Sequence, residues 1–408
     1  MLTNEEKKID VYKNNKPTDS SKVTPDTSLD SLNLNWTENE LPEKIRTKHV
    51  HRLHPYLGKF IPQLVEIFLR KYFKVGETIL DPFCGSGTTL VQAKELGINA
   101  IGYDISEFNT ILCRAKTTNY NISKMEKEVR NILKKVRNAT QIDLKQKTLF
   151  DNRIIDFNLD KIFDEYLKIW FAPKALFELL TYRDFIEKGN YEYNDLLKII
   201  LSRSARSARL TTHFDLDFPK KPQIEPYQCY KHSRICRPTT EAFKFINRYS
   251  IDTIKRIKEF AEVSRNVKIE VFHADSRKSK FPIVDDVITS PPYVGLIDYH
   301  EQHAYAYHLF NLKDNREFEI GAASNGTSKK AKETYKKDII EVFQHVIESL
   351  KTDGRLIVIA NDSANFYGDV AKSLNIEIEK ILQRHVNRRT GRRASEFFES
   401  IFIWRKLK

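Results

Sequence analysis

The segment from Thr78 to Asp104 constrains the fold more than any other part of the chain. A short apolar run, Thr78-Ile-Leu, leads directly into Asp81-Pro-Phe-Cys-Gly-Ser-Gly-Thr-Thr, and the residues from Thr88 to Leu96 then follow a helical pattern. A second apolar run, Ala100-Ile-Gly-Tyr, ends in Asp104. This order of strand, glycine turn, helix, strand and acid is typical of the first half of a doubly wound parallel sheet.

The same alternation returns in the last third of the chain. Apolar runs predict strands at 267–272, 284–289 and 355–360, with a helix from about Lys330 to Leu350 that Gly354 ends. Residues 376–382 and 397–404 predict an antiparallel hairpin at the edge of the sheet. Between the two parts, residues 119–265 are mainly helical in pattern. The simplest architecture is one α/β sheet interrupted by a helical insertion of the size of a domain.

Four segments follow from this pattern. Residues 1–46 are polar with few apolar anchors and predict a mobile arm. Residues 47–118 form the first part of the core and residues 266–408 the second. Residues 119–265 form the helical insertion.

Composition narrows the class of protein. The chain has 408 residues, of which 40% are hydrophobic, enough for a sizeable core. No apolar run approaches the length of a membrane span, and the first ten residues are too charged for a signal peptide. Four cysteines in a chain of this size do not form a disulfide framework. We therefore expect a soluble cytoplasmic protein. The net charge of +13 favours a polyanionic partner, although a genomic bias toward Lys, Asn and Ile would also produce it.

The glycine turn at Asp81–Thr89 excludes two familiar nucleotide sites. A P-loop needs Gly-Lys-Ser/Thr, but Gly87 is followed by Thr88. The dinucleotide fingerprint needs a third glycine, which is missing. What remains is a glycine turn with an acid before it and Asp104 at the end of the next strand. That pattern fits an adenosine-bearing ligand whose ribose hydroxyls need an acceptor.

Ser290-Pro-Pro-Tyr follows another predicted buried strand. Two adjacent prolines cannot continue a central strand, so the chain leaves the sheet there in a stiff, extended conformation. Its free oxygens and the Tyr293 ring would suit a planar base that carries an amino group. An ordinary strand terminator would have the same sequence.

These two motifs together resemble the S-adenosylmethionine-dependent DNA amino-methyltransferases of restriction-modification systems. Asp81-Pro-Phe-Cys-Gly-Ser-Gly matches the cofactor loop of that family, Asp-Pro-Phe-x-Gly-x-Gly, and Ser290-Pro-Pro-Tyr matches its catalytic motif. His54-Pro-Tyr-Leu-Gly-Lys-Phe looks like the motif upstream of the cofactor loop. The resemblance covers roughly residues 50–118 and 267–408. It implies a Rossmann-like, seven-stranded class I methyltransferase core with S-adenosylmethionine as cofactor.

The resemblance also implies roles for individual residues. Asp104 would hold the ribose hydroxyls and Asp275 the adenine edge. The full set expected at the cofactor is Tyr56, Lys59, Phe60, Asp81, Pro82, Phe83, Gly85, Gly87, Thr88, Asp104 and Asp275. The catalytic set is Ser290, Pro291, Pro292 and Tyr293. The serine form of this motif is typical of enzymes that make N4-methylcytosine, whereas adenine enzymes usually carry Asn or Asp. Adenine at its amino group is the alternative.

The sequence positions of the cysteines favour methylation of an amine over methylation of a ring carbon. Methylation of a ring carbon of cytosine needs a thiolate, usually in a Pro-Cys pair, and none of the four cysteines follows a proline. An exocyclic amine attacks the methyl group directly when it is held in line, so neither a covalent enzyme intermediate nor a metal is needed. A non-catalytic DNA-binding module with the same fold is the alternative from a different class. We expect a monomer that acts on double-stranded DNA, with a restriction endonuclease as a separate partner.

The target base must rotate out of the duplex to reach such a pocket, so the DNA needs to be held on both sides. Two basic clusters are candidates for these contacts. The first lies in the insertion, which we assign to target recognition: Arg203, Arg206, Arg209, Lys231 and Arg234. The second lies in the turn of the C-terminal hairpin: Arg388, Arg389, Arg392 and Arg393.

Cys229-x-x-His232-x-x-x-Cys236 has the spacing of zinc ligands. The sequence has no obvious fourth ligand nearby, and His213 is one candidate. We therefore take two buried cysteines and a surface or phosphate-contacting histidine as the default, with no metal.

Overall fold

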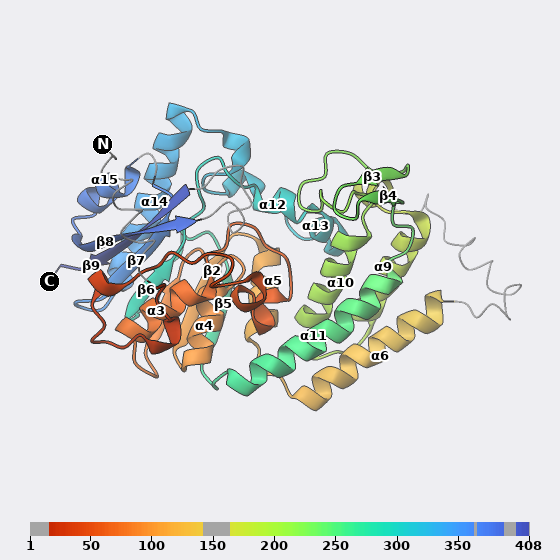
Figure 1. Cartoon of the computed structure of the whole chain (residues 1–408), viewed down its shortest axis with the longest axis horizontal. Helices are drawn as coiled ribbons and strands as arrows, with labels where there is room; N and C mark the ends of the chain where they lie inside the picture. Colours follow the sequence, from red (N-terminus) through yellow and green to blue (C-terminus); the bar gives the residue numbers. More distant parts are fainter. Residues whose placement is uncertain (1–15, 142–163, 363–364, 387–396, 408) are drawn as a thin grey trace, which may run out of the picture.

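The computed structural model describes residues 16–141, 164–362, 365–386 and 397–407. Figure 1 shows two units side by side, a twisted sheet with helices on both faces and a set of long helices. The described part of the sheet unit contains seven strands in the order β5-β2-β1-β6-β7-β9-β8. In chain order these strands are β1 (Thr78–Asp81), β2 (Asn99–Asp104), β5 (Ile269–His273), β6 (Asp286–Thr289), β7 (Arg355–Ala360), β8 (Glu377–Val386) and β9 (Phe397–Arg405). This order confirms the predicted fold class.

The sheet is parallel except at one strand. β5, β2, β1, β6 and β7 pair in parallel, while β9 runs antiparallel between β7 and β8. Ile79 on β1 pairs with Ala100 on β2 and with Asp286 on β6. The chain therefore leaves β1 toward one edge of the sheet and returns at β6 toward the other. In such sheets the crevice beyond the carboxyl ends of the two central strands is the usual ligand site.

Alternating side chains bury both faces of the sheet. Ile79 packs on the face that carries α3 (Pro62–Tyr72) and α4 (Thr88–Leu96). Its neighbour Leu80 packs on the opposite face, against α14 (Lys329–Ser349) and α15 (Phe366–Ser373). This period of two is a property of extended backbone, and burial of both faces explains why these strands have nearly continuous apolar sequences.

The second unit is a helical bundle with its own hydrophobic cluster. It contains α6 (Ile122–Thr140), α8 (Glu165–Trp170), α9 (Pro173–Lys188), α10 (Asn194–Ala208) and α11 (Phe243–Val263). Other described parts of the chain share this cluster: α5 (Glu107–Thr117) and Val91 of α4 from the sheet unit, and α13 (Ala304–Phe310), which comes after the Ser290-Pro-Pro-Tyr motif. The two units are thus joined by a continuous apolar core. No described helix has the length and apolar character needed to span a lipid bilayer.

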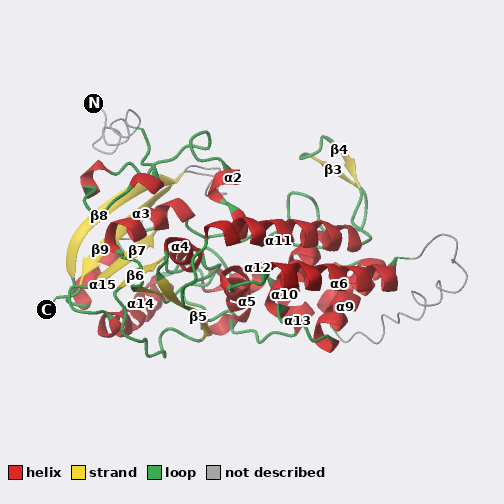
Figure 2. Cartoon of the chain, turned by 90° about the horizontal axis from the view of Figure 1, so that it is seen from below, coloured by secondary structure: helices red, strands yellow, loops and turns green. Residues whose placement is uncertain are grey.

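Shorter elements complete the described chain. The hairpin of β3 (Tyr227–Cys229) and β4 (Arg234–Cys236) forms a separate two-stranded sheet. Figure 2 shows it standing away from the long helices. The remaining helices are α2 (Glu43–Arg46), α12 (Tyr299–Gln302) and the 3-10 turns Ser20–Lys22, Leu29–Ser31, His49–Arg52, Arg316–Phe318 and Ala323–Asn325.

The predicted N-terminal arm differs from the structure over residues 16–46. Val23, Leu32 and Leu34 are buried in the same cluster as α3. Polar contacts fix the segment as well: Lys71 donates to the carbonyl of Thr27 at 2.6 Å, and the Asn35 side chain accepts the His385 N–H at 2.6 Å. The apolar anchors are few and irregularly spaced, so no helical or strand period reveals them. Residues 1–15 lie outside the described part of the chain.

Candidate functional site

A pocket of about 780 Å³, partly open to solvent, lies beyond the carboxyl ends of β1, β2 and β6. Residues from both sequence motifs face it. The lining comprises Tyr56, Gly58, Lys59, Phe60, Pro82, Phe83, Cys84, Gly85, Ser86, Thr88, Asp104, Ile105, Ser106, Asn109, Asp275, Ser276, Ser290, Pro292, Tyr299, Phe318, Glu319 and Ile320.

The turn after β1 needs its glycines. Gly85 and Gly87 have φ values of 48° and 78°, in the left-handed region. A side chain on Gly87 would also place its Cβ 2.9 Å from the Cys113 sulfur. The turn closes with the Gly87 N–H donating to the Cys84 carbonyl at 2.7 Å, after which α4 begins. Gly85 lines the pocket, whereas Gly87 lies behind it against α5.

Asp104 is fixed at the end of β2 by three donors. Its carboxylate accepts the Gly85 N–H at 2.8 Å, the Ser106 N–H at 2.8 Å and the Asn109 side-chain amide at 3.0 Å. Burial raises the pKa of Asp104, and these hydrogen bonds oppose the rise because they favour the charged form. The carboxylate is therefore oriented before any ligand arrives, and its remaining lone pairs can accept hydroxyl protons.

Asp275 lies across the pocket, after β5. Its carboxylate accepts two hydrogen bonds from the Arg277 guanidinium, at 3.0 Å and 2.8 Å, and the Arg277 N–H at 3.0 Å. Arg277 in turn reaches Asp338 on α14 at 3.3 Å. The ion pair holds Asp275 at the pocket wall.

Asp81 does not line the pocket, although we expected it at the cofactor. It is buried at the end of β1, where it accepts the Thr289 hydroxyl at 2.7 Å and the Phe83 N–H at 3.2 Å. Burial raises the pKa of Asp81 to about 6. Thr289 immediately precedes Ser290, so Asp81 connects the glycine turn to the catalytic motif. We therefore expect Asp81 to position these two segments and not to contact a ligand.

The catalytic motif divides between the pocket and its support. Ser290 and Pro292 line the pocket, while Pro291 and Tyr293 do not. The Tyr293 hydroxyl donates to Glu399 at 2.9 Å, and Glu399 accepts a second bond from Arg384 at 3.0 Å. Burial, followed by the Glu399 charge, raises the pKa of Tyr293 well above its ordinary value. The C-terminal hairpin β8–β9 thus braces the motif from behind.

The upstream motif forms the third wall. Tyr56, Lys59 and Phe60 all line the pocket, as expected. The Tyr56 ring stacks on Tyr299 with centroids 5.5 Å apart, and its hydroxyl accepts from Asn109 at 3.2 Å. The Tyr56 hydroxyl lies so close to Gly85 that an added Cβ there would sit 3.1 Å away.

Several lining residues carry no signal that the sequence reasoning used. Glu319 is buried and accepts the N–H groups of Tyr299 and His300 at 3.3 Å and 3.1 Å. It belongs to the loop between α13 and α14, which has no recognisable motif. Ser106 was detectable, because Ser-Glu-Phe-Asn is a typical helix start and its hydroxyl accepts the Asn109 N–H at 3.2 Å.

The three arginines along α10 and its C-cap, which we expected to contact DNA, make contacts within the protein. Arg203 pairs with Asp252 at 2.6 Å, and Arg206 pairs with Asp217 at 2.6 Å. Arg209 is only 2% exposed and stacks over the Tyr305 ring, 4.4 Å from its centroid. Arg203 and Arg206 are partly exposed and Arg209 is buried, and local carboxylates and a ring contact the three charges.

Lys231 and Arg234 are exposed on the β3–β4 hairpin and are free to meet a polyanion. Arg388, Arg389, Arg392 and Arg393 lie outside the described residues. Asp298, in the loop after the Ser290-Pro-Pro-Tyr motif, is buried as the N-cap of α12 and accepts the Glu301 N–H at 2.8 Å.

The pocket residues fit S-adenosylmethionine. Asp104 stands where ribose hydroxyls need an acceptor, and Ile105, Phe318 and Ile320 offer apolar surface for a base. Three carboxylates in the lining, Asp104, Asp275 and Glu319, favour a sulfonium by their charge. Lys59 is the one cation in this lining and suits the carboxylate of the amino-acid end.

Comparison with known proteins gives the family. A family model described as DNA methylase matches residues 2–111, and one described as D12 class N6 adenine-specific DNA methyltransferase matches residues 58–213. The chain is 36% identical over 430 residues to the type II methyltransferase M.MjaII of Methanocaldococcus jannaschii, covering 89% of this chain and 81% of the relative. It is 25% identical over 347 residues to the type II methyltransferase M.BsoBI of Geobacillus stearothermophilus, covering 78% of this chain and 64% of the relative.

A solved structure also matches, the rRNA methyltransferase aviRa from Streptomyces viridochromogenes. It is 10% identical with a TM-score of 0.33, over 87% of this chain and 89% of that one. A similarity this low supports no conclusion about function. The relation to M.MjaII supports membership of a family, because it extends over most of both chains. This protein therefore belongs to the type II DNA methyltransferases of restriction-modification systems, which take their methyl group from S-adenosylmethionine.

Proposed function

We propose that this enzyme methylates the exocyclic N4 amine of cytosine in double-stranded DNA. The observation that carries the proposal is that Gly85 and Asp104, from the cofactor half, line the same pocket as Ser290 and Pro292, from the catalytic half. Gly85 follows β1, Asp104 ends β2 and Ser290 follows β6. β1 is the direct neighbour of both β2 and β6. A methyl donor and an everted base would therefore meet without further rearrangement of the sheet.

Within this proposal the cofactor half binds and orients. Asp104 accepts the ribose hydroxyls, Asp275 contacts the adenine edge and Lys59 pairs with the carboxylate. Tyr56, Phe60, Pro82, Phe83, Gly85 and Thr88 shape the walls, with Asp81 and Gly87 holding the turn from behind. When bound, S-adenosylmethionine supplies an electrophilic methyl group on a sulfonium.

The catalytic half orients the base. The Ser290 hydroxyl and the carbonyl groups of the motif accept hydrogen bonds from the amine, which withdraws its lone pair from ring conjugation. Ser290 and these carbonyl groups would thus hold the amine nitrogen toward the electrophilic methyl group that the bound cofactor would supply. The amine proton is released to solvent. Positioning supplies most of the catalysis, and Pro291, Pro292 and Tyr293 keep the motif rigid.

Adenine at N6 is the second candidate, favoured by the D12 adenine model that matches residues 58–213. That match ends before Ser290, so it covers the cofactor half and part of the helical unit but none of the residues that would hold the base. Both bases present an aromatic amine. The choice between them depends on the catalytic motif, whose serine form supports cytosine.

Nucleoside analysis tests the base. DNA methylated by the purified enzyme is digested to nucleosides and examined by mass spectrometry, and we expect N4-methylcytosine. Ser290→Ala should lower kcat by at least about tenfold, because the amine loses an acceptor. Ser373→Ala, an exposed serine on α15, is the matched control. N6-methyladenine as the sole product would overturn the assignment.

We further propose that the helical unit contributes target recognition through the β3–β4 hairpin, where Lys231 and Arg234 are exposed. The C-terminal arginines Arg388, Arg389, Arg392 and Arg393 stay a prediction for the other side of the duplex. Arg392→Ala with Arg393→Ala should weaken DNA binding and flatten its salt dependence without changing cofactor affinity. Equal loss of cofactor affinity would assign that turn to the fold instead.

Cofactor titration separates an enzyme from a non-catalytic DNA-binding module. We expect S-adenosylmethionine and its demethylated product to bind the pocket, with the enzyme acting as a monomer and a restriction endonuclease acting separately. A chain that binds duplex DNA tightly yet shows no affinity for either compound would favour the module.

A further inference from the structure

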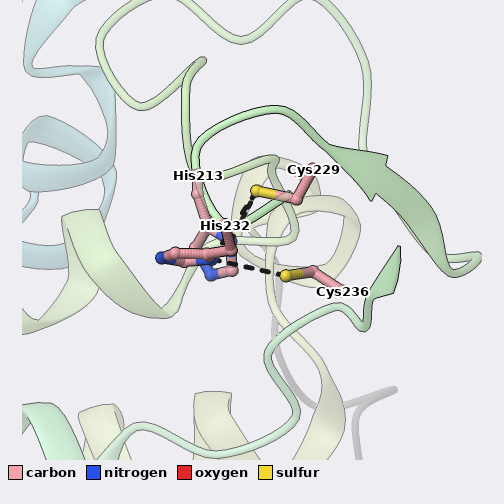
Figure 3. Close-up of side chains that lie close together, drawn as sticks. All are labelled: His213, Cys229, His232 and Cys236. Atoms are coloured by element: carbon pink, nitrogen blue, oxygen red, sulfur yellow. Dashed lines mark hydrogen bonds between the residues drawn. The ribbon is translucent and has the colours of Figure 1, made fainter. Parts of the chain in front are cut away.

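Four potential metal ligands converge beside the β3–β4 hairpin. Figure 3 shows His213, Cys229, His232 and Cys236 with their side chains directed toward one another. Cys229 and Cys236 come from the two strands, His232 from the turn between them, and His213 from the segment that follows α10. One ligand atom from each residue lies within 4.8 Å of all the others.

The separations match a tetrahedral zinc site. The Cys229 sulfur is 3.5 Å from Nδ1 of His213 and 3.6 Å from Nδ1 of His232, and the Cys236 sulfur is 3.4 Å from Nδ1 of His232. Zinc bound tetrahedrally at about 2.3 Å to sulfur and about 2.0 Å to nitrogen separates such atoms by about 3.5 Å. The set of two thiolates and two imidazoles is also a common one for structural zinc.

The local backbone brings the ligands together. The His232 N–H donates to the Cys229 carbonyl at 3.2 Å, and Ser233 takes a left-handed conformation with φ of 51°. This tight turn returns the His232 ring over the Cys229 sulfur. The Tyr227 hydroxyl accepts the His213 N–H at 3.0 Å and also lies 3.0 Å from Nδ1 of the same ring. A zinc ion bound at Nδ1 of His213 would leave the hydrogen bond from the His213 backbone N–H to the Tyr227 hydroxyl in place. The proton of that hydroxyl would then point away from the ring.

The hairpin has little else to hold it. β3 and β4 have three residues each, and isolated two-stranded hairpins are marginal in water. Cys229 and Cys236 are 0% and 7% exposed, yet neither belongs to the three hydrophobic clusters found among the described residues. Tyr230 and Ile235, by contrast, are 82% and 70% exposed. The two sulfurs are therefore buried within the group of four ligands and not in a hydrophobic core. A metal ion that crosslinks a small unit produces this kind of burial.

We propose that His213, Cys229, His232 and Cys236 bind one structural zinc ion that fixes the β3–β4 hairpin to the segment after α10. The sequence alone favoured two cysteines without a metal, because the fourth ligand was not obvious. The fold supplies His213 from 16 residues before Cys229. The site is closed by four protein ligands, so its part is structural rather than catalytic.

Metal content of the full-length protein tests the proposal directly. Protein expressed with zinc and purified without chelator should contain about one zinc per chain by mass spectrometry of the metal. Cys229→Ser and His232→Ala should each lower this to below about 0.2 per chain, because three ligands hold the ion far more weakly. Cys113→Ala, a buried cysteine beneath the glycine turn, and His345→Ala, on α14, are matched controls that should keep the full content.

Two further measurements separate loss of the site from loss of the fold. Cobalt in place of zinc should give the intense visible absorption of a tetrahedral thiolate site in the wild type and lose it in Cys229→Ser. Cofactor affinity should stay unchanged in Cys229→Ser, because the pocket is built on the sheet. Wild-type protein without metal after zinc reconstitution, zinc retained in both variants, or a Cys229–Cys236 disulfide under reducing conditions would each overturn the proposal.

Discussion

The cofactor pocket and the β3–β4 hairpin place functional side chains in opposite ways. In the pocket, Asp104 and Ser290 stand at the ends of strands whose neighbours on both faces are buried, so the sheet fixes their backbone. In the hairpin, Arg234 begins the three-residue strand β4 and Lys231 lies in the turn before it, outside any apolar cluster of the described chain. Packing on both faces of the sheet fixes the first region, whereas we assign the order of the second to a metal ion.

This difference shows which basic residues are useful for predicting a DNA-binding surface. The arginines of α10 are periodic but lie in the bundle, where Asp252, Asp217 and Tyr305 neutralise or cover them. The basic residues of the hairpin show no period, yet they are exposed. A charge that lies on a well-packed element is more often used for packing than for recognition.

The largest expected effect tests the pocket. Asp104→Asn keeps the size of the side chain but removes the charge that we propose accepts the two ribose hydroxyls. We expect S-adenosylmethionine affinity to fall by about 100-fold or more in calorimetric titration, since hydrogen bonds to a charged group contribute about 1.5–3 kcal/mol each. Zinc content should not change, because the two regions are independent.

Asp285→Asn is the control for this variant. Asp285 also accepts a backbone N–H of β1, that of Thr78 at 2.7 Å, but at the opposite end of the strand and away from the pocket. Its cofactor affinity should match the wild type. A similar loss in both variants would mean that Asp104 acts on the sheet and not on the ligand.

The sequence predicted the pocket better than its surroundings, for a physical reason. Asp81 and Ser290 each stand at the end of an apolar run, which is a pattern that can be recognised locally in the sequence. Parallel pairing of these strands then brings the two ends to one edge of the sheet. Glu319 and Asn109 enter the pocket through loop and helix geometry, which leaves no periodic signal. His213 joins Cys229 only because the chain folds back after α10. The pairing of Arg384 with Glu399 likewise depends on the register of β8 and β9.

The second prediction concerns that pair, which braces Tyr293. Glu399→Ala leaves the Arg384 guanidinium, whose side chain is 5% exposed, without a counter-charge. We expect a loss of about 3–5 kcal/mol in the free energy of unfolding, measured in urea. Glu379→Ala, on β8 of the same hairpin, breaks a more exposed pair with Arg355 of β7 and should cost less than about 1 kcal/mol.

A double variant sharpens this result. Glu399→Leu with Arg384→Met removes both charges, and we expect it to recover most of the stability, since no unpaired ion remains. Activity should stay low if Tyr293 needs Glu399 to hold its hydroxyl. Full activity in the stable double variant would show that the brace serves the fold alone.

The third prediction uses His303, the N-cap residue of α13. Its ring stacks on Tyr56 of the pocket, with centroids 5.5 Å apart. Burial, and then the charge of Arg206 on α10, lowers the pKa of His303 to about 4. Between pH 6.5 and 4 the unfolded chain therefore binds a proton that the folded chain does not, so stability falls as the pH falls through this window.

The size of this effect is about 3 kcal/mol at most, from a shift of roughly two and a half pKa units. Urea unfolding at pH 7 and pH 4.5 should show a smaller acid loss in His303→Gln than in the wild type. Burial also lowers the pKa of the neighbouring His54, so part of the acid loss should remain. An identical pH profile in wild type and variant would show that His303 is not kept neutral.

The smallest expected effect concerns the hairpin and ties it to the zinc proposal. Lys231→Ala with Arg234→Ala should weaken binding to duplex DNA by about tenfold and lower the slope of log affinity against log salt by about 2, because two phosphate contacts are lost. Lys127→Ala with Lys134→Ala removes the same charge from exposed positions on α6 and should change neither quantity. If zinc orders the hairpin, its removal by a chelator should produce a similar loss in the wild type but little further loss in the Lys231/Arg234 double variant. Additive losses would mean that the metal and the two cations act on separate parts of the DNA surface, because a shared element can be disabled only once.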